Sequence, residues 1–318
     1  MKKILVSGAG GQIGSELVPH LRSIYGSDNV VAADLRENAV LAAGGPFVLM
    51  DALDARALAG TVKEHGIDTI YNLVALLSVV GERDPQRAWN INMTALMNAL
   101  EVAREYGCGV FTPSSIGAFG PDTPKDGTPQ DTIMHPTTIY GVCKVSGELL
   151  SNYYNLKFGV DTRSVRFPGI ISNVTLPGGG TTDYAVEIFY EAVKSGSFVC
   201  PLPKDAFMDM LYMPDALDAC VGLMEADPAK LVHRNSFNVT AMSFSPDILC
   251  KEIQKVIPSF TMTYDVDPVK EAISASWPNS LDDSAARREW GWSPKWDLKA
   301  MVGDMLRIIG EKHAKGLI

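Results

Sequence analysis

The stretch Gly8-Ala9-Gly10-Gly11-Gln12-Ile13-Gly14 follows a predicted strand at residues 3–7, which contains the apolar run Ile4-Leu5-Val6, and opens a helical pattern over residues 12–25. Glycines at positions 8 and 11 allow a tight turn and a close approach of the backbone to a pyrophosphate, and Gly14 lets the helix pack closely on the strand. The free N–H groups and the dipole at the start of such a helix attract phosphates. This context predicts a dinucleotide-binding turn, with Gln12 and Ile13 also against the cofactor.

An acidic residue, Asp34, closes the next predicted strand at residues 29–34, at the spacing of about 20 residues that is typical of dinucleotide-binding folds. A carboxylate at this place accepts hydrogen bonds from the adenosine ribose and repels a 2′-phosphate, which favours NAD over NADP. Arg36 could contact such a phosphate and weaken the preference. The alternative is a purely local role for Asp34 and the glycines in a tight turn.

Short apolar strands alternate with helical patterns through the first half of the chain. The alternation predicts an α/β fold of the Rossmann type, a doubly wound parallel sheet covered on both faces. The predicted strands are 3–7, 29–34, 46–50, 68–74, 109–113 and 161–166, and the predicted helices are 12–25, 55–65, 85–106 and 138–158.

After residue 168 the alternation loosens, and a chain of 318 residues is long enough for a second core. We expect a flexible loop at Pro177-Gly178-Gly179-Gly180, a helix at 183–195, and a strand–helix unit at 209–225 that returns to the sheet. Further helices are expected near 245–256, 282–290 and 297–312. The predicted domains are an NAD-binding domain of 1–170 plus about 208–239, and a smaller, discontinuous C-terminal substrate-binding domain of about 171–207 plus 240–318.

Composition excludes several classes of function. A net charge of −9 argues against nucleic-acid binding and against an anionic membrane surface. No apolar run approaches the roughly 20 residues that span a bilayer. Five dispersed cysteines indicate neither a disulfide framework nor a zinc site, and five scattered histidines lack the spacing of metal ligands. We therefore expect a cytoplasmic protein without a metal.

Tyr140 and Lys144 lie four residues apart in a predicted helix, on one face. A phenol with a pKa of about 10 is a poor base, and a lysine cation together with the charge of a nicotinamide favours the phenolate. Ser115 follows the strand at 109–113, where its hydroxyl can hold a reacting oxygen while Tyr140 moves its proton. The alternative for Ser115 is a structural role in its turn, which is the role we expect for Ser114.

Asp51 follows the third strand, where carboxylates face the ligand crevice of such a sheet. Asp51, with its neighbour Ala52, is therefore a candidate for binding the adenine, with turn chemistry as the equal alternative. Asp54 is better interpreted as the N-cap of the following helix.

These features together resemble the extended short-chain dehydrogenase/reductase superfamily, which includes UDP-galactose 4-epimerase. The resemblance implies hydride transfer by Ser115, Tyr140 and Lys144 with a nicotinamide cofactor, whose ribose Lys144 also holds. It further implies a homodimer that pairs two long helices, near 90–106 and 140–158. The matching positions are Gly8, Gly11, Gly14, Asp34, the segment Asn72-Leu73-Val74-Ala75 with Leu73 and Ala75 lining the cofactor, Asn92, Arg166-Phe167-Pro168-Gly169 with backbone near Ile170 at the carboxamide, and Trp290-Gly291-Trp292-Ser293-Pro294.

Two segments narrow the substrate by resemblance. Nucleotide-sugar members carry an arginine for the diphosphate at the place of Met208, which cannot bind one. The run from Gly178 through Thr181 and Thr182 resembles the substrate loop of short-chain L-threonine 3-dehydrogenases, as do the segments around Ser115 and Trp277. We expect one of these threonines to cap the helix that starts near residue 183, which leaves the other free to bind substrate.

The resemblance thus implies NAD-dependent oxidation of the L-threonine 3-hydroxyl to L-2-amino-3-oxobutanoate, which can decarboxylate to aminoacetone. Ser78, after the fourth strand, is a further candidate for the substrate pocket, or else a solvent-facing loop residue. The competing interpretations are a nucleotide-sugar epimerase or dehydratase with the same catalytic set, and a non-catalytic NAD-binding regulator.

Overall fold

A parallel sheet forms the centre of the molecule. The structure is a computed structural model that describes residues 1–176 and 178–318; Pro177, the first residue of the predicted glycine-rich loop, lies outside the described residues. Within that part of the chain, six strands pair in the order β3-β2-β1-β4-β5-β7, and every pairing is parallel. These strands are β1 (Ile4–Ser7), β2 (Val30–Asp34), β3 (Phe47–Leu49), β4 (Thr69–Asn72), β5 (Gly109–Phe111) and β7 (Thr162–Arg163).

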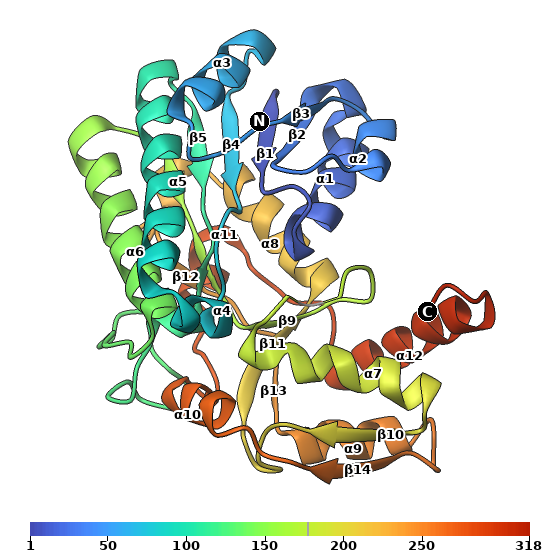
Figure 1. Cartoon of the computed structure of the whole chain (residues 1–318). Coiled ribbons are helices and arrows are strands. Elements are labelled where there is room, and N and C mark those ends of the chain that lie inside the picture. Colours follow the sequence, from blue (N-terminus) through green and yellow to red (C-terminus); the bar gives the residue numbers. More distant parts are fainter. Residues whose placement is uncertain (177) are drawn as a thin grey trace.

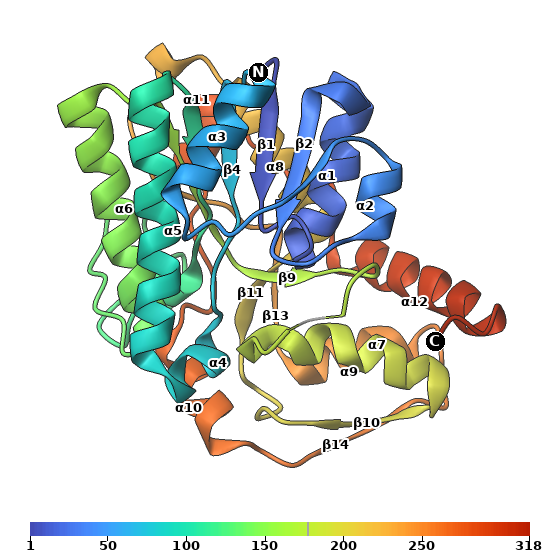
Figure 2. The same cartoon turned by 45° about the horizontal axis from the view of Figure 1, so that its top comes forward.

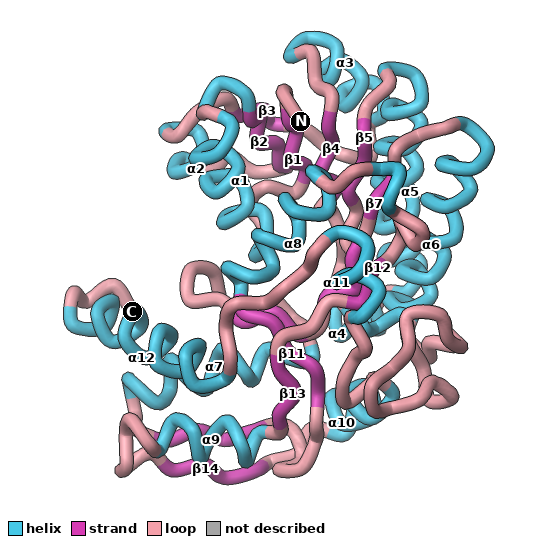
Figure 3. Tube along the Cα trace, turned by 180° about the vertical axis from the view of Figure 1, so that it is seen from behind, coloured by secondary structure: helices cyan, strands magenta, loops and turns pink. Residues whose placement is uncertain are grey.

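Helices cover both faces of this sheet, as Figures 1 and 3 show from opposite sides. Successive strand side chains point to opposite faces, so Ile4 and Val6 join one buried cluster while Leu5 joins another. The first cluster includes side chains of α1 (Gln12–Tyr25), α8 (Met213–Glu225) and α11 (Ser284–Trp290); the second includes side chains of α3 (Ala55–His65), α5 (Pro85–Tyr106) and α6 (Ile139–Phe158). The predicted doubly wound fold is confirmed.

A third buried cluster lies beyond the carboxyl ends of the strands, in the lower part of Figure 2. Its side chains come from the two segments of the predicted substrate-binding domain, 171–207 and 240–318. It also contains side chains of β11, which the sequence analysis placed in the NAD-binding domain, and the division into these two domains stays a prediction. The elements around it are α7 (Tyr184–Lys194), α9 (Pro246–Gln254), α10 (Pro268–Ser276), α12 (Leu298–Ala314), β10 (Ser197–Cys200) and β14 (Thr261–Tyr264).

Two strands differ from the prediction. β11 (Met208–Tyr212) does not return to the central sheet but pairs with β9 (Gly169–Ile171) and β13 (Met242–Phe244), because alternate side chains of β11 are buried in the third cluster. The strand predicted at 161–166 divides at Ser164, whose N–H bonds to the carbonyl of Arg234. Beyond it, β8 (Val165–Phe167) lies between β6 (Ser114–Ser115) and β12 (Phe237–Asn238).

Several short elements escaped prediction. Among them are α2 (Ala39–Ala43), α4 (Ser78–Arg83), α10, β10, β13, β14 and four 3₁₀ turns of the described chain, at Ser27–Asn29, Ile116–Ala118, Thr181–Asp183 and Pro228–Lys230. Two of them, α4 and the turn at Thr181–Asp183, meet at the candidate site.

Candidate active site

The glycine-rich turn is built by close backbone contacts. Gly8 has a φ of +76°, which favours glycine, and a Cβ there would lie 3.1 Å from the backbone of Leu73 and Val74. A Cβ on Gly14 would lie only 2.5 Å from the carbonyl oxygen of Gly8, so α1 packs directly on the turn as expected. Gly11 is the N-cap of α1, and no described side chain caps it. The first N–H groups of α1 therefore remain available to an anion.

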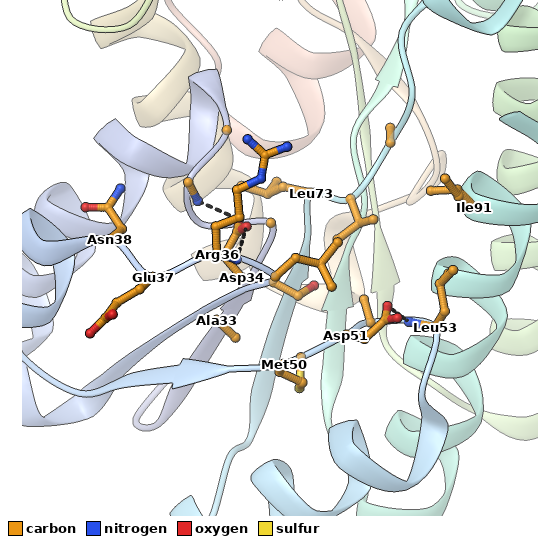
Figure 4. A pocket seen from close by; sticks show the side chains of 18 residues that line it. Ala33, Asp34, Arg36, Glu37, Asn38, Met50, Asp51, Leu53, Leu73 and Ile91 are labelled. Carbon is orange, nitrogen blue, oxygen red and sulfur yellow. Dashed lines mark hydrogen bonds between the residues drawn. The ribbon is translucent and has the colours of Figure 1, made fainter. Parts of the chain in front are cut away.

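A cleft of about 530 Å³ runs from this turn along the carboxyl ends of β2 and β3 (Figure 4). The carboxylate of Asp34 accepts hydrogen bonds from the N–H of Gly10 at 2.8 Å and of Arg36 at 3.3 Å. Asp51 lines the same cleft, and its carboxylate accepts a hydrogen bond from the N–H of Leu53 at 2.9 Å. Asp51 therefore stabilises its own turn, as the alternative interpretation holds, and is also exposed to the cleft. The lining includes Gly8, Gly11, Asp34, Asp51, Ala52, Leu73 and Ala75.

A second cavity, of about 150 Å³, continues from the first because Leu73 and Ala75 line both. It brings together segments that are far apart in the sequence, from α1, α4, α6 and the loops after β5, β8 and α10. Among the lining residues are Gln12, Ile13, Ser78, Ser115, Tyr140, Lys144, Ile170, Thr181, Thr182, Asp183 and Trp277.

The helix α6 presents Tyr140 and Lys144 to this cavity. It begins where the hydroxyl of Thr138 accepts a hydrogen bond from the N–H of Gly141 at 3.1 Å. A Cβ on Gly141 would lie 2.1 Å from the carbonyl oxygen of Gly117, so the helix rests on the turn that follows Ser115. The Lys144 ammonium lies 5.3 Å from the centroid of the Tyr140 ring. The helix and the strand end are therefore in direct contact at the reacting groups.

The two serines of β6 differ in their surroundings. The hydroxyl of Ser115 accepts from the N–H of Gly117 at 3.1 Å and lines the cavity, which keeps its own proton free for a ligand. The hydroxyl of Ser114 donates to the buried carboxylate of Glu148 at 2.5 Å. This contact agrees with the structural role expected for Ser114.

The segment before α7 also lines this cavity. Our expectation that Thr181 or Thr182 caps α7 is wrong: no side chain of the described residues caps that helix. The carboxylate of Asp183 instead accepts from the N–H groups of Gly179 at 2.9 Å and Gly180 at 2.8 Å. Burial raises the pKa of Asp183, against the effect of these hydrogen bonds. Asp183 is not among the site residues predicted from the sequence, which does not show which acid would receive a substrate ammonium.

Two buried polar atoms point to a ligand. Among the described residues, the hydroxyl of Thr181 and the amide nitrogen of Gln12 have no hydrogen-bond partner although both are buried, and both residues line the second cavity. A buried polar group without a partner costs stability. The pair therefore fits a cavity whose polar partners arrive with the bound molecules.

Three other candidates have distinct placements. Ser78 is buried at the start of α4 and lines the cavity, so it is not a solvent-facing loop residue. Gly178 is exposed and is not among the lining residues, whereas Gly180 is. Asn92 lines neither large cavity; its side-chain amide bonds to the backbone N–H and carbonyl of Leu76, at 2.7 and 3.2 Å, and so holds the segment after β4.

Residues 1–176 and 178–318 lack two other kinds of feature. No group of three or more His, Cys, Asp or Glu side chains there could hold a metal ion. In the same residues, no helix combines the length and apolar character that a membrane crossing needs.

Comparison with known proteins defines the class. Residues 4–240 match the model of the NAD dependent epimerase/dehydratase family, and the protein belongs to this family. The description of the family as NAD dependent agrees with the glycine-rich turn and Asp34. Membership in this family confirms the prediction of NAD as the cofactor. An uncharacterized epimerase/dehydratase of Staphylococcus haemolyticus is 55% identical over 315 residues, which cover 98% of this chain and 99% of the relative.

Solved structures of L-threonine dehydrogenases are similar to this protein over nearly its whole length. It is similar to the X-ray structure of L-threonine dehydrogenase from Clostridium difficile, with a TM-score of 0.96 and 54% identity over 98% of both chains. It is also similar to a monomeric L-threonine 3-dehydrogenase from a metagenome, with a TM-score of 0.94 and 40% identity over 97% of this chain and 99% of that one. The resemblance inferred from the sequence is thereby confirmed.

Proposed function

We propose that the protein is an NAD-dependent L-threonine 3-dehydrogenase, which oxidises the C3 hydroxyl of L-threonine to L-2-amino-3-oxobutanoate. The observation that carries the proposal is the cavity of about 150 Å³, whose lining brings Ser115, Tyr140 and Lys144 together with Thr181 and Asp183. Pockets for drug-sized ligands measure roughly 300–1,000 Å³, so this one suits an amino acid rather than a nucleotide sugar. The structural similarity to L-threonine dehydrogenases supports the same substrate.

The catalytic roles follow from position. Tyr140 takes the hydroxyl proton, and Ser115 holds the same oxygen through its free hydroxyl proton. Lys144 stabilises the phenolate and holds the nicotinamide ribose. NAD, when bound, supplies the acceptor for the hydride that leaves C3. The keto acid formed can then lose CO₂ in solution to give aminoacetone.

The cofactor is held by the larger cleft. The N–H groups of the turn and of the first residues of α1, including Gln12, bind the pyrophosphate, and Asp34 binds the adenosine ribose. Asp51 and Ala52 lie where the adenine would be placed, and Leu73, Ala75 and Ile170 line the path toward the nicotinamide. Asn92 contributes indirectly, by fixing the segment of Ala75 and Ser78 through Leu76.

The zwitterionic part of the substrate is met by the segment before α7. The unpartnered hydroxyl of Thr181, with Thr182 and the N–H groups nearby, receives the carboxylate, and Asp183 receives the ammonium. Trp277 and Ser78 also line the cavity. Met208, at the place where nucleotide-sugar members carry an arginine, is fully buried in the third cluster and leaves no cation there for a diphosphate.

We also propose a homodimer through α5 and α6, which lie side by side at one edge of the molecule (Figure 1). An exposed apolar row follows one face of α6, at Val142, Leu149, Tyr153 and Leu156, and Met97 of α5 is exposed as well. Such a row at helical spacing is a typical interface. All five cysteines are free and buried, which suits a reducing compartment such as the cytoplasm.

The test is a substrate panel. Purified protein is mixed with NAD or NADP and with L-threonine, L-serine, L-allo-threonine or D-threonine, and formation of the reduced cofactor is followed by absorbance. The proposal predicts rapid reduction of NAD that is selective for L-threonine and unaffected by EDTA. Reduction with none of these amino acids would remove L-threonine as the substrate and turn attention to UDP-sugars.

A further inference from the structure

A buried ion pair lies behind the catalytic face of α6. The carboxylate of Glu148 meets the guanidinium of Arg166, on β8, in a bidentate arrangement with N···O distances of 2.8 and 3.0 Å. The two side chains are only 4% and 5% exposed. The remaining terminal nitrogen of Arg166 donates to the carbonyl of Gln130 at 2.8 Å and to the side-chain oxygen of Asn238 at 3.1 Å. The pair is thus held firmly from several elements.

Both partners hold the short strand that carries Ser115. Glu148 accepts the hydroxyl proton of Ser114 at 2.5 Å. Arg166 pairs with Ser114 in the register of β6 and β8, which places Phe167 opposite Ser115. The position of Ser115 therefore depends on Glu148 through a side chain and on Arg166 through the backbone.

The same pair fixes the helix. Tyr140, Lys144 and Glu148 follow at four-residue spacing and share one face of α6. Lys144 also reaches the segment before Ser115, through a 2.6 Å hydrogen bond to the carbonyl of Pro113. However, the proposed function also requires Lys144 to contact the nicotinamide ribose and Tyr140. The hydrogen bond from Lys144 to Pro113 therefore does not by itself hold the two segments together throughout the reaction. Glu148 and Arg166 are absent from the described lining of the cofactor cleft and of the second cavity, and Glu148 lines only a small pocket of about 30 Å³ beside Ser114 and Lys144. The pair can therefore hold one geometry throughout turnover.

Stability alone does not account for such a pair. Replacing a buried ion pair by apolar side chains of similar size is often neutral or stabilising, because desolvation offsets the attraction between the charges. What a bidentate, fully hydrogen-bonded pair supplies is a fixed distance and direction between two elements. Fixed geometry matters here, because a displacement of about 1 Å at reacting groups can cost on the order of 10²-fold in rate.

We propose that the Glu148–Arg166 ion pair is the positioning device that sets Ser115 on β6 against Tyr140 and Lys144 on α6. Glu148 and Arg166 are then positioning residues for the alcohol oxidation. This inference rests on the proposed function, since the rate in question is that of L-threonine oxidation.

The test replaces both charges at once, with Glu148→Met and Arg166→Met in one protein. The expected variant is folded and binds NAD normally in a direct titration, yet its kcat falls about 10²-fold. Its melting temperature should fall as well, because the Ser114 hydroxyl, the Gln130 carbonyl and the Asn238 side chain lose their partners. The matched control is Asp161→Asn. It breaks an ion pair between Asp161 and the buried Arg163, whose N···O distance is 2.8 Å and which lies at the far end of the sheet. The control should lower the melting temperature and keep kcat.

Either of two results would overturn the proposal: wild-type kcat in the folded double variant, or an equal loss of kcat in the control. If the double variant fails to fold, Ser114→Ala decides, because it removes only the link from Glu148 to β6. That variant should lose kcat with little change in melting temperature; an unchanged kcat contradicts the proposal.

A measurement without turnover separates this inference from the proposed function. Wild-type protein that does not oxidise L-threonine would contradict the proposed function alone. In that case, crystal structures of the wild type and of the Ser114→Ala variant decide the positioning role. The proposal expects the Ser115 hydroxyl to shift relative to the Tyr140 hydroxyl, and an unshifted position would overturn it.

Discussion

Lys144 and Tyr140 lie one helical turn apart on α6, with the ammonium 5.3 Å from the centroid of the phenol ring, at the edge of a cavity that also contains Ser115. This relationship joins a fixed cation to the group that must take up the proton of an alcohol. It depends on the contact of α6 with the backbone of Gly117, which only a glycine at position 141 permits.

Removal of the phenol hydroxyl should separate binding from catalysis. In Tyr140→Phe, kcat for L-threonine should fall by about 10²- to 10⁴-fold, the usual contribution of a positioned proton acceptor, while NAD binding persists. Steady-state kinetics and a binding titration measure the two effects. Tyr264→Phe, at an exposed tyrosine of β14 that lines neither the cleft nor the second cavity, is the control and should behave as wild type. Substantial activity in Tyr140→Phe would rule out the proton role.

The hydroxyl of Thr181 should contribute to the binding of L-threonine and not to the stability of the fold. Because this buried atom has no described partner, Thr181→Val should leave the melting temperature unchanged or raise it. The KM for L-threonine should rise about tenfold or more, as expected for loss of a hydrogen bond to a charged group. In the control Thr61→Val, the lost hydroxyl bonds to Ala57, so stability should fall while KM stays constant. An unchanged KM in Thr181→Val would remove Thr181 from the substrate site.

A buried acid makes stability depend on pH. Burial of Asp209, on β11, raises its pKa from 3.8 to about 7, although Thr240 and the N–H of Leu281 donate to it. Between these values the folded state binds more protons than the unfolded state, so the free energy of unfolding contributed by Asp209 decreases as pH rises from about 4 to about 7. Melting temperatures of wild type and Asp209→Asn across this range should converge at low pH and diverge at neutral pH, with the variant the more stable. Parallel curves would contradict the assignment.

The exposed apolar row on α6 predicts the oligomeric state. Wild-type protein should sediment as a dimer, and Leu149→Lys with Leu156→Lys should give a monomer, since burying two unpaired charges in an interface is costly. Val232→Lys, an equally exposed apolar position elsewhere, should stay dimeric. A monomeric wild type, like the monomeric structural neighbour, would contradict the dimer.

Features that depend on local sequence could be predicted, and those that depend on distant contacts could not. The glycine-rich turn, Asp34 and the Tyr140–Lys144 spacing are local patterns, and topology alone places Ser115 at a strand end. One local contact was nevertheless missed: the carboxylate of Asp183 accepts from the N–H groups of Gly179 and Gly180, four and three residues earlier, and the expected threonine cap is not formed.

The departure of β11 from the central sheet has a long-range cause. Met208 and Met210 are buried against α7, α9 and α12, which follow or precede β11 by many residues. The Glu148–Arg166 pair likewise joins a helix to a strand through contacts that no periodicity reveals. In each case a tertiary contact overrides a correct local pattern.

Transfer of deuterium from C3 of the substrate tests the central claim most directly. Wild-type protein is incubated with NAD and L-threonine that carries deuterium at C3, and the masses of the reduced cofactor and of the products are determined. The account predicts deuterium in the reduced cofactor, with 2-amino-3-oxobutanoate or aminoacetone as the product. Reduced cofactor without deuterium, or unchanged L-threonine beside unreduced NAD, would contradict it.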